Sequence, residues 1–113
     1  MIDDLSGLDE SELLIKIGMD LAEKEMLIGP LSKQALLEKG QNWFEKNYTN
    51  FEKAICLNEK ARSFSNSSDT DTATVLAAIA DLISSICIGV PPFTVAQLLL
   101  KRGLKVLCKK YWK

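Results

Sequence analysis

The sequence predicts an all-α fold: a small helical bundle of four to five helices around a central hydrophobic helical hairpin. Apolar residues recur at helical spacing along much of the chain, and the stretch from Thr72 to Leu100 carries one formal charge, Asp81. At 113 residues, of which 47% are apolar and 26% charged, the chain has the size and composition of one globular domain. We therefore expect residues 1–113 to form a single helical domain.

The first helix is expected to begin near residue 9. Ser6 and Ser11 are N-cap candidates, and acidic residues at positions 9, 10 and 12 suit the positive end of a helix dipole. An apolar stripe follows at helical spacing, with Gly18 permitting a close neighbour on that side; its members are Leu13, Leu14, Ile17 and Leu21. The Gly29-Pro30 pair is expected to end this region.

From Leu36 the sequence follows a seven-residue register in which Glu and Lys recur together. The glutamates are Glu38, Glu45, Glu52 and Glu59, and an apolar seam runs through Leu37, Phe44, Tyr48, Phe51 and Ile55. This pattern is typical of a helix packed nearly parallel to a partner. We expect a long helix over about residues 33–62 with a kink or break between Asn47 and Asn50. Gly40 and the capping box Thr49-x-x-Glu52 leave a division into two helices open.

Residues 63–71 are polar and are expected to form an internal loop. The hairpin follows, with arms at about 72–88 and 92–111. Its first arm is apolar nearly all round, as expected of a central buried helix, and Pro92 suits the first position of the second arm. From Lys101 that arm turns amphipathic, with Lys101, Lys105 and Lys109 at i, i+4, i+8.

The first arm is about long enough to span a bilayer, so the free energies of insertion decide between a membrane and a core. Seven aliphatic residues favour insertion by about 2–4 kcal/mol in total, whereas a central Asp81 costs about 2.5–3.5. The second arm has eight residues from Phe93 before Lys101, too few to cross back. Burial in a soluble core is therefore favoured. Asp81 either faces an edge or pairs with a lysine, or it is a possible switch sensitive to protonation.

Charge is unevenly distributed along the chain, although the net charge is −1. Residues 1–30 carry eight acids and two bases, whereas residues 101–113 carry six bases and no acid. The two ends either match each other internally, or the basic end is offered to an acidic partner. The glutamates likewise either pair with the C-terminal lysines or set the register of an oligomer.

The three cysteines, Cys56, Cys87 and Cys108, show no C-x-x-C spacing, and an odd count leaves at least one unpaired. Together with an acidic N-terminus, unlike a secretory leader, this favours a cytoplasmic location. The chain has no histidine, so neither a catalytic base of the commonest kind nor a usual zinc site is expected. We expect no enzyme activity, cofactor, metal or small-molecule substrate. Nucleic-acid binding is disfavoured by a pI of about 5.4.

These exclusions favour a non-enzymatic protein-interaction module, a small regulatory or accessory subunit that forms homo- or hetero-oligomers. The alternative is a membrane-acting protein that exposes the hairpin of residues 72–100 at anionic lipid. Trp43 either widens the core contact beside Phe44 or stands exposed as an interface anchor. The candidate partner-binding residues are Trp43, Glu38, Glu45, Glu52, Glu59, Lys101, Arg102, Lys105, Lys109 and Trp112.

Overall fold

The computed structural model describes residues 9–24, 32–66 and 72–112, and in these ranges it contains helices and no strand. The all-helical prediction is therefore confirmed. The helices are α1 (Glu10–Lys24), α2 (Lys33–Lys46), α3 (Tyr48–Cys56), α4 (Glu59–Asn66), α5 (Thr72–Ile83), α6 (Pro92–Arg102) and α7 (Leu104–Leu107). The expected cap at Ser6, the stop at Gly29-Pro30 and the loop residues 67–71 lie outside the described residues.

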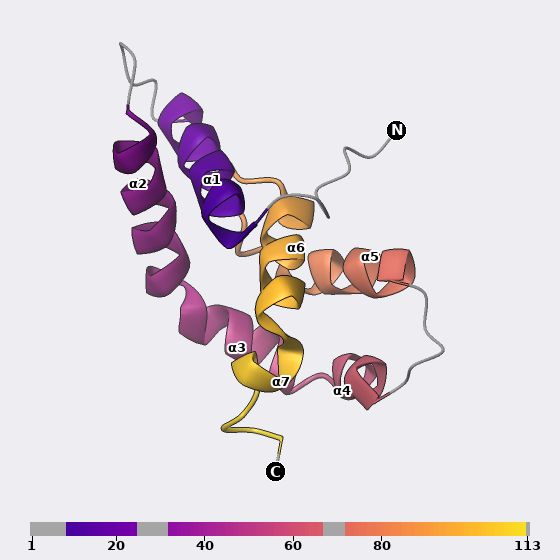
Figure 1. Cartoon of the computed structure of the whole chain (residues 1–113). Helices are drawn as coiled ribbons and strands as arrows, with labels where there is room; N and C mark the ends of the chain where they lie inside the picture. The colour runs from indigo at the N-terminus through magenta and orange to yellow at the C-terminus, as the bar shows by residue number, and fades with distance from the viewer. Residues whose placement is uncertain (1–8, 25–31, 67–71, 113) are drawn as a thin grey trace.

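Helices α1 and α2 run side by side and form one edge of the molecule (Figure 1). Asp9 caps α1 by a reciprocal pair of bonds: the Glu12 N–H donates to Asp9 Oδ1 at 2.8 Å, and the Asp9 N–H donates to Glu12 Oε1 at 3.4 Å. Ser32 caps α2 by accepting from the Ala35 N–H at 3.1 Å. The predicted stripe of α1 is buried in full: Leu13, Leu14, Ile17 and Leu21 are all at most 7% exposed.

Two glycines let these helices touch backbone to backbone. A Cβ atom at Gly18 would collide with the Leu36 carbonyl, and a Cβ atom at Gly40 would collide with the Leu14 carbonyl. The predicted close neighbour of Gly18 is thus α2. Gly40, which weakened the expectation of a continuous helix, lies within α2 as the reciprocal half of this contact.

The long helix expected over residues 33–62 is divided into α2, α3 and α4. The first break lies at Asn47, whose side chain donates to the Trp43 carbonyl at 2.9 Å, at the edge of the interval predicted for it. A second break, which was not expected, lies at Leu57 and Asn58. Asn58 Oδ1 accepts from two N–H groups of the first turn of α4, at 3.0 and 3.2 Å, and so begins a new helix.

The α5–α6 hairpin is present, but its first arm is shorter and less central than predicted. Helix α5 ends at Ile83 instead of Ile88, and one of its faces is exposed at Ala73, Thr74, Ala77 and Asp81. The central helix is α6, which contacts α1, α5 and α7 (Figure 1). Four of its apolar side chains, Val95, Ala96, Leu98 and Leu99, are at most 1% exposed. Hydropathy alone did not show that small residues on α5 face outward.

The second arm does not continue to residue 111. It ends at Gly103, whose φ of 96° is incompatible with a continuous helix, and the short α7 follows. At the other end of the hairpin, Pro91 precedes α6 and Pro92 occupies its first position, as predicted. Of the loop expected at residues 63–71, residues 63–66 instead form the end of α4.

Candidate interaction surface

Arg102 joins the N-terminal and C-terminal parts of the fold. Its Nε atom donates to Glu10 Oε1 at 3.1 Å, and its guanidinium lies 4.7 Å from the centroid of the Phe44 ring. This contact realises one part of the internal charge match that the sequence allows. Arg102 therefore contributes to the packing of α6 against α1 and α2, and less of it is available to a partner.

The three lysines of the predicted C-terminal stripe, Lys101, Lys105 and Lys109, are all exposed. The break at Gly103 means that they do not share one continuous helical face. Val106, also exposed at 64%, lies among them in the sequence. In the parts of the chain that the structure describes, Lys105 and Lys109 form no ion pair with the glutamates of residues 38–59.

The four glutamates do not form one stripe, because their helices are separate. Glu38 and Glu45 are exposed on α2, and Glu59 is exposed on α4. Glu52 lies on α3 beside the buried Phe51 and is only 8% exposed. Glu52 is thus poorly placed to contact a partner, whereas the other three remain accessible.

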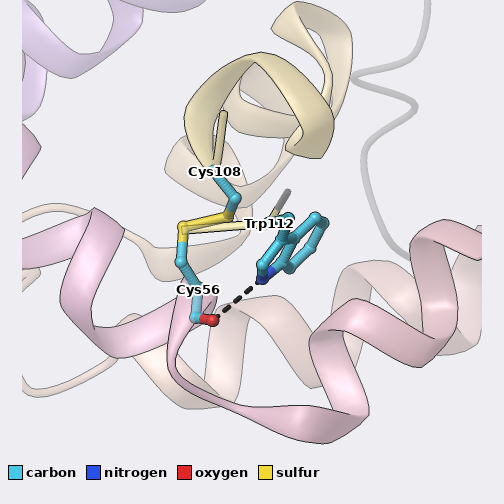
Figure 2. The surroundings of a disulfide bond; sticks show 3 residues. All are labelled: Cys56, Cys108 and Trp112. Carbon is cyan, nitrogen blue, oxygen red and sulfur yellow. Dashed lines mark hydrogen bonds between the residues drawn. A yellow bond between two sulfur atoms is a disulfide. The ribbon is translucent and has the colours of Figure 1, made fainter. Parts of the chain in front are cut away.

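The two tryptophans are half-buried. Trp43 packs against the core with its ring centroid 5.8 Å from that of Phe51, which favours the core-widening alternative for this residue. Trp112 packs beside the C-terminal cysteine, and its indole N–H donates to the Cys56 carbonyl at 2.9 Å (Figure 2). Both side chains therefore have a structural role, and Trp112 keeps one side toward a cleft described below.

A disulfide joins Cys56 at the end of α3 to Cys108 just after α7 (Figure 2). This pair is not predictable from the sequence, because the spacing of three cysteines does not indicate which two meet. Cys87 is the free cysteine, and burial raises the pKa of its thiol to about 11. At neutral pH Cys87 is protonated and therefore a poor nucleophile.

A cleft of about 220 Å³ opens between the end of α3, the start of α4 and the C-terminal turn. We call it the C-terminal cleft; its lining residues are Cys56, Leu57, Asn58, Glu59, Arg62, Tyr111 and Trp112. Leu57 is 67% exposed at this site. Of the predicted partner-binding residues, Glu59 and Trp112 are brought together here, and Leu57 was missed.

Asp20 was also missed by the sequence analysis. It lines a second cleft, of about 500 Å³, together with Glu23, Lys24, Gly89 and Pro91. Among the described residues, its Oδ2 atom is buried with no hydrogen-bond partner. Burial raises the pKa of Asp20; the positive charge of Lys16 opposes this rise and the negative charge of Glu23 adds to it.

Asp81 is exposed on the outer face of α5. It lines a shallow cleft of about 230 Å³ with Ala77, Ala80, Ser84, Pro92 and Phe93. The hypothesis that Asp81 is a switch sensitive to protonation required its charge to be buried. Asp81 faces solvent, so the structure gives this hypothesis no support. The alternative, in which Asp81 faces an edge, is favoured.

In the described ranges, no group of three or more Cys, Asp or Glu side chains is placed to hold a metal ion, and no helix is long and apolar enough to cross a membrane. Comparisons with family models, with curated proteins and with solved structures found no significant match. Any function assigned to this chain therefore has to be inferred from its own surface.

Proposed function

We propose that this protein is a non-enzymatic interaction module, a regulatory or accessory subunit that binds another protein or a second copy of itself. One observation carries the proposal: exposed glutamates on α2 and exposed lysines at the C-terminal end form no ion pair with one another within the described part of the chain. Glu38 and Glu45 are exposed on α2, and Lys105 and Lys109 are exposed at the C-terminal end.

Charges arranged in this way favour orientation and rate of association more than affinity. Exposed pairs within a monomer contribute about 0–1 kcal/mol, so leaving them unpaired costs the fold little. A partner with complementary charge would be steered to one face and rejected from the other. Packing of apolar side chains would then have to supply most of the affinity.

Charge reversal on each face tests the proposal. Glu38→Lys with Glu45→Lys reverses the two exposed glutamates of α2, and Lys105→Glu with Lys109→Glu reverses the two exposed lysines at the C-terminal end. All four side chains are exposed, so both variants should keep the helical content of the wild type. The immobilised wild type is expected to retain a protein, either from a host extract or from a pool of isotope-labelled copies of this chain. We expect at least one of the two variants to fail to retain that protein. Identical retention by all three proteins would contradict the proposal.

A membrane-acting protein is the second candidate function. The end of the α5–α6 hairpin supports it, because Ile88 is 66% exposed and Phe93 is 40% exposed there. Against it, Phe93 and Lys101 lie at opposite ends of α6, about 12 Å apart along the helix axis at 1.5 Å per residue. The hairpin end and these lysines would meet one bilayer surface together only if α6 lay parallel to that surface. Flotation with anionic liposomes tests this: binding lost in Ile88→Ser would support it, and no binding would remove it.

The cytoplasmic location belongs to the same proposal, and the disulfide is evidence against it. Cytosolic thiols are kept reduced, whereas buried disulfides persist in oxidising compartments. Alkylation of protein taken directly from its host, followed by mass measurement, distinguishes a reducing from an oxidising compartment. Three modified cysteines after denaturation would support a cytoplasmic location, and one modified cysteine, Cys87, would indicate an oxidising compartment.

A further inference from the structure

The C-terminal cleft is too small for most ligands and suits a single side chain. Pockets for small molecules and cofactors usually measure about 300–1,000 Å³, and this cleft measures about 220 Å³. Its apolar lining includes Leu57, Tyr111 and Trp112. Aromatic side chains around a small depression are typical of the places where a partner protein inserts an anchor residue.

The walls of the C-terminal cleft are held together covalently and by hydrogen bonds. The disulfide fixes the C-terminal turn to the end of α3, and the Trp112 indole donates to the Cys56 carbonyl at 2.9 Å (Figure 2). The backbone N–H groups of Tyr111 and Trp112 both donate to the Cys108 carbonyl at 2.8 Å. A partner would therefore bind a preformed surface and would lose less free energy to ordering of side chains.

The charge around the cleft is mainly positive. Arg62 lines it, and three further cations lie within two residues of a lining residue in the sequence: Lys60, Lys109 and Lys110. All four are exposed, and the carboxylate among the lining residues is Glu59. Four cations beside one carboxylate attract an acidic chain and repel a basic one.

We propose that the C-terminal cleft binds an acidic segment of a partner protein, which inserts one large apolar side chain between Leu57 and the aromatic pair. This inference rests on the proposed function and names the place and chemistry of the contact. Nucleic acid also carries negative charge, but it offers no aliphatic side chain for the exposed Leu57. The combination of an apolar wall with a basic rim therefore favours a protein segment.

Peptide selection on the intact, oxidised protein tests the proposal. A library of random peptides displayed on phage is selected on the wild type after depletion on Leu57→Ser. We expect the recovered peptides to share several acidic residues and one large apolar residue. Recovery of peptides without excess acid, or without a common apolar residue, would overturn the proposal.

A fluorescein-labelled synthetic copy of the most enriched peptide then serves as the probe in anisotropy titrations. Leu57→Ser and Lys110→Glu should each weaken its binding at least tenfold. Two matched controls should stay within twofold of the wild type: Ile88→Ser, since Ile88 is exposed at 66% against 67% for Leu57, and Lys33→Glu, which reverses an exposed charge on α2. Equal binding by Leu57→Ser and the wild type would overturn the proposal.

Two further experimental outcomes would also overturn the assignment of this cleft to an acidic protein segment. Binding of a labelled single-stranded DNA oligomer that also requires Leu57 would overturn the proposal by naming nucleic acid as the occupant. Retention of host proteins that persists in Leu57→Ser and Lys110→Glu would leave the interaction module standing and place its surface elsewhere. The failure of this inference is thus distinguishable from failure of the proposed function.

Discussion

Replacing Gly40 by alanine tests the backbone contact between α1 and α2. In an ordinary helix this change stabilises by about 1 kcal/mol, because alanine has the higher helix propensity. Here the new Cβ atom would collide with the Leu14 carbonyl, and a backbone carbonyl cannot move aside as a flexible side chain can. The helices must separate, and a gap of about 0.5–1 Å forfeits a quarter to a half of the dispersion energy of the atoms lining it.

Overpacking of this kind costs about 1–3 kcal/mol in a core that can adjust. Because the obstacle is backbone, we expect the upper end of that range, and a net loss of about 2 kcal/mol after the gain in helix propensity. For a domain of this size that loss corresponds to a fall in Tm of about 8 °C. Urea unfolding followed by far-ultraviolet circular dichroism measures it.

Asn42→Ala is the matched control, because Asn42 is exposed on the same helix and its replacement changes helix propensity without a clash. It should stabilise by about 0.5 kcal/mol. Gly18→Ala should destabilise as Gly40→Ala does, since its Cβ would meet the Leu36 carbonyl. The double variant should lose less than the sum, because the first change has already separated the helices. Stabilisation by Gly40→Ala would refute the reasoning.

Three further predictions concern the disulfide, Asp20 and Arg102. Cys56→Ala should lower the free energy of unfolding by about 4 kcal/mol, from the loop entropy of a bond that spans 52 residues; urea unfolding with and without reductant measures it. Asp20→Asn should raise it at pH 7, where the partly desolvated carboxylate is charged, and leave it unchanged below pH 3.8. Arg102→Met should lower it by about 1–1.5 kcal/mol, since it removes the exposed ion pair and the cation–π contact.

A specific result would contradict each of these three predictions. Cys87→Ala removes a cysteine outside the disulfide, so an equal loss in Cys87→Ala and Cys56→Ala would contradict the first. For Asp20, the raised pKa of the folded state means that stability is lost as pH rises from the unfolded pKa through the folded one. A gain in Asp20→Asn that persists below pH 3.8 would contradict the second. Lys105→Met, an exposed cation, should change little, and an equal effect would contradict the third.

The sequence predicted best what depends on neighbours along the chain. The stripe of α1 was correct at every position, since helical spacing alone decides which side chains share a face. The close approach at Gly18 and the start of α6 at Pro92 were also correct, because each depends on one residue's own backbone and side-chain geometry.

What the sequence could not predict depends on contacts between distant segments. One face of α5 is exposed because α5 packs against its neighbours with the other face, and hydropathy does not encode which face that is. Glu52 is buried on α3, and the heptad register, which assumed one continuous helix, did not predict its burial. The disulfide and the exposed Leu57 beside it follow from the meeting of α3 with the C-terminal turn, 52 residues apart in the sequence.

The central claim is that this protein binds another protein through its exposed charged surface. The most direct test measures what the immobilised protein retains from a host extract and from an isotope-labelled pool of its own chain, as salt rises from about 50 to 500 mM. The account predicts a retained protein whose binding weakens steeply with salt, as screened charge requires. That binding should also be lost on reversal of Lys105 and Lys109 or of Glu38 and Glu45. A retained set that neither salt nor either reversal changes would contradict the claim, as would retention of nothing.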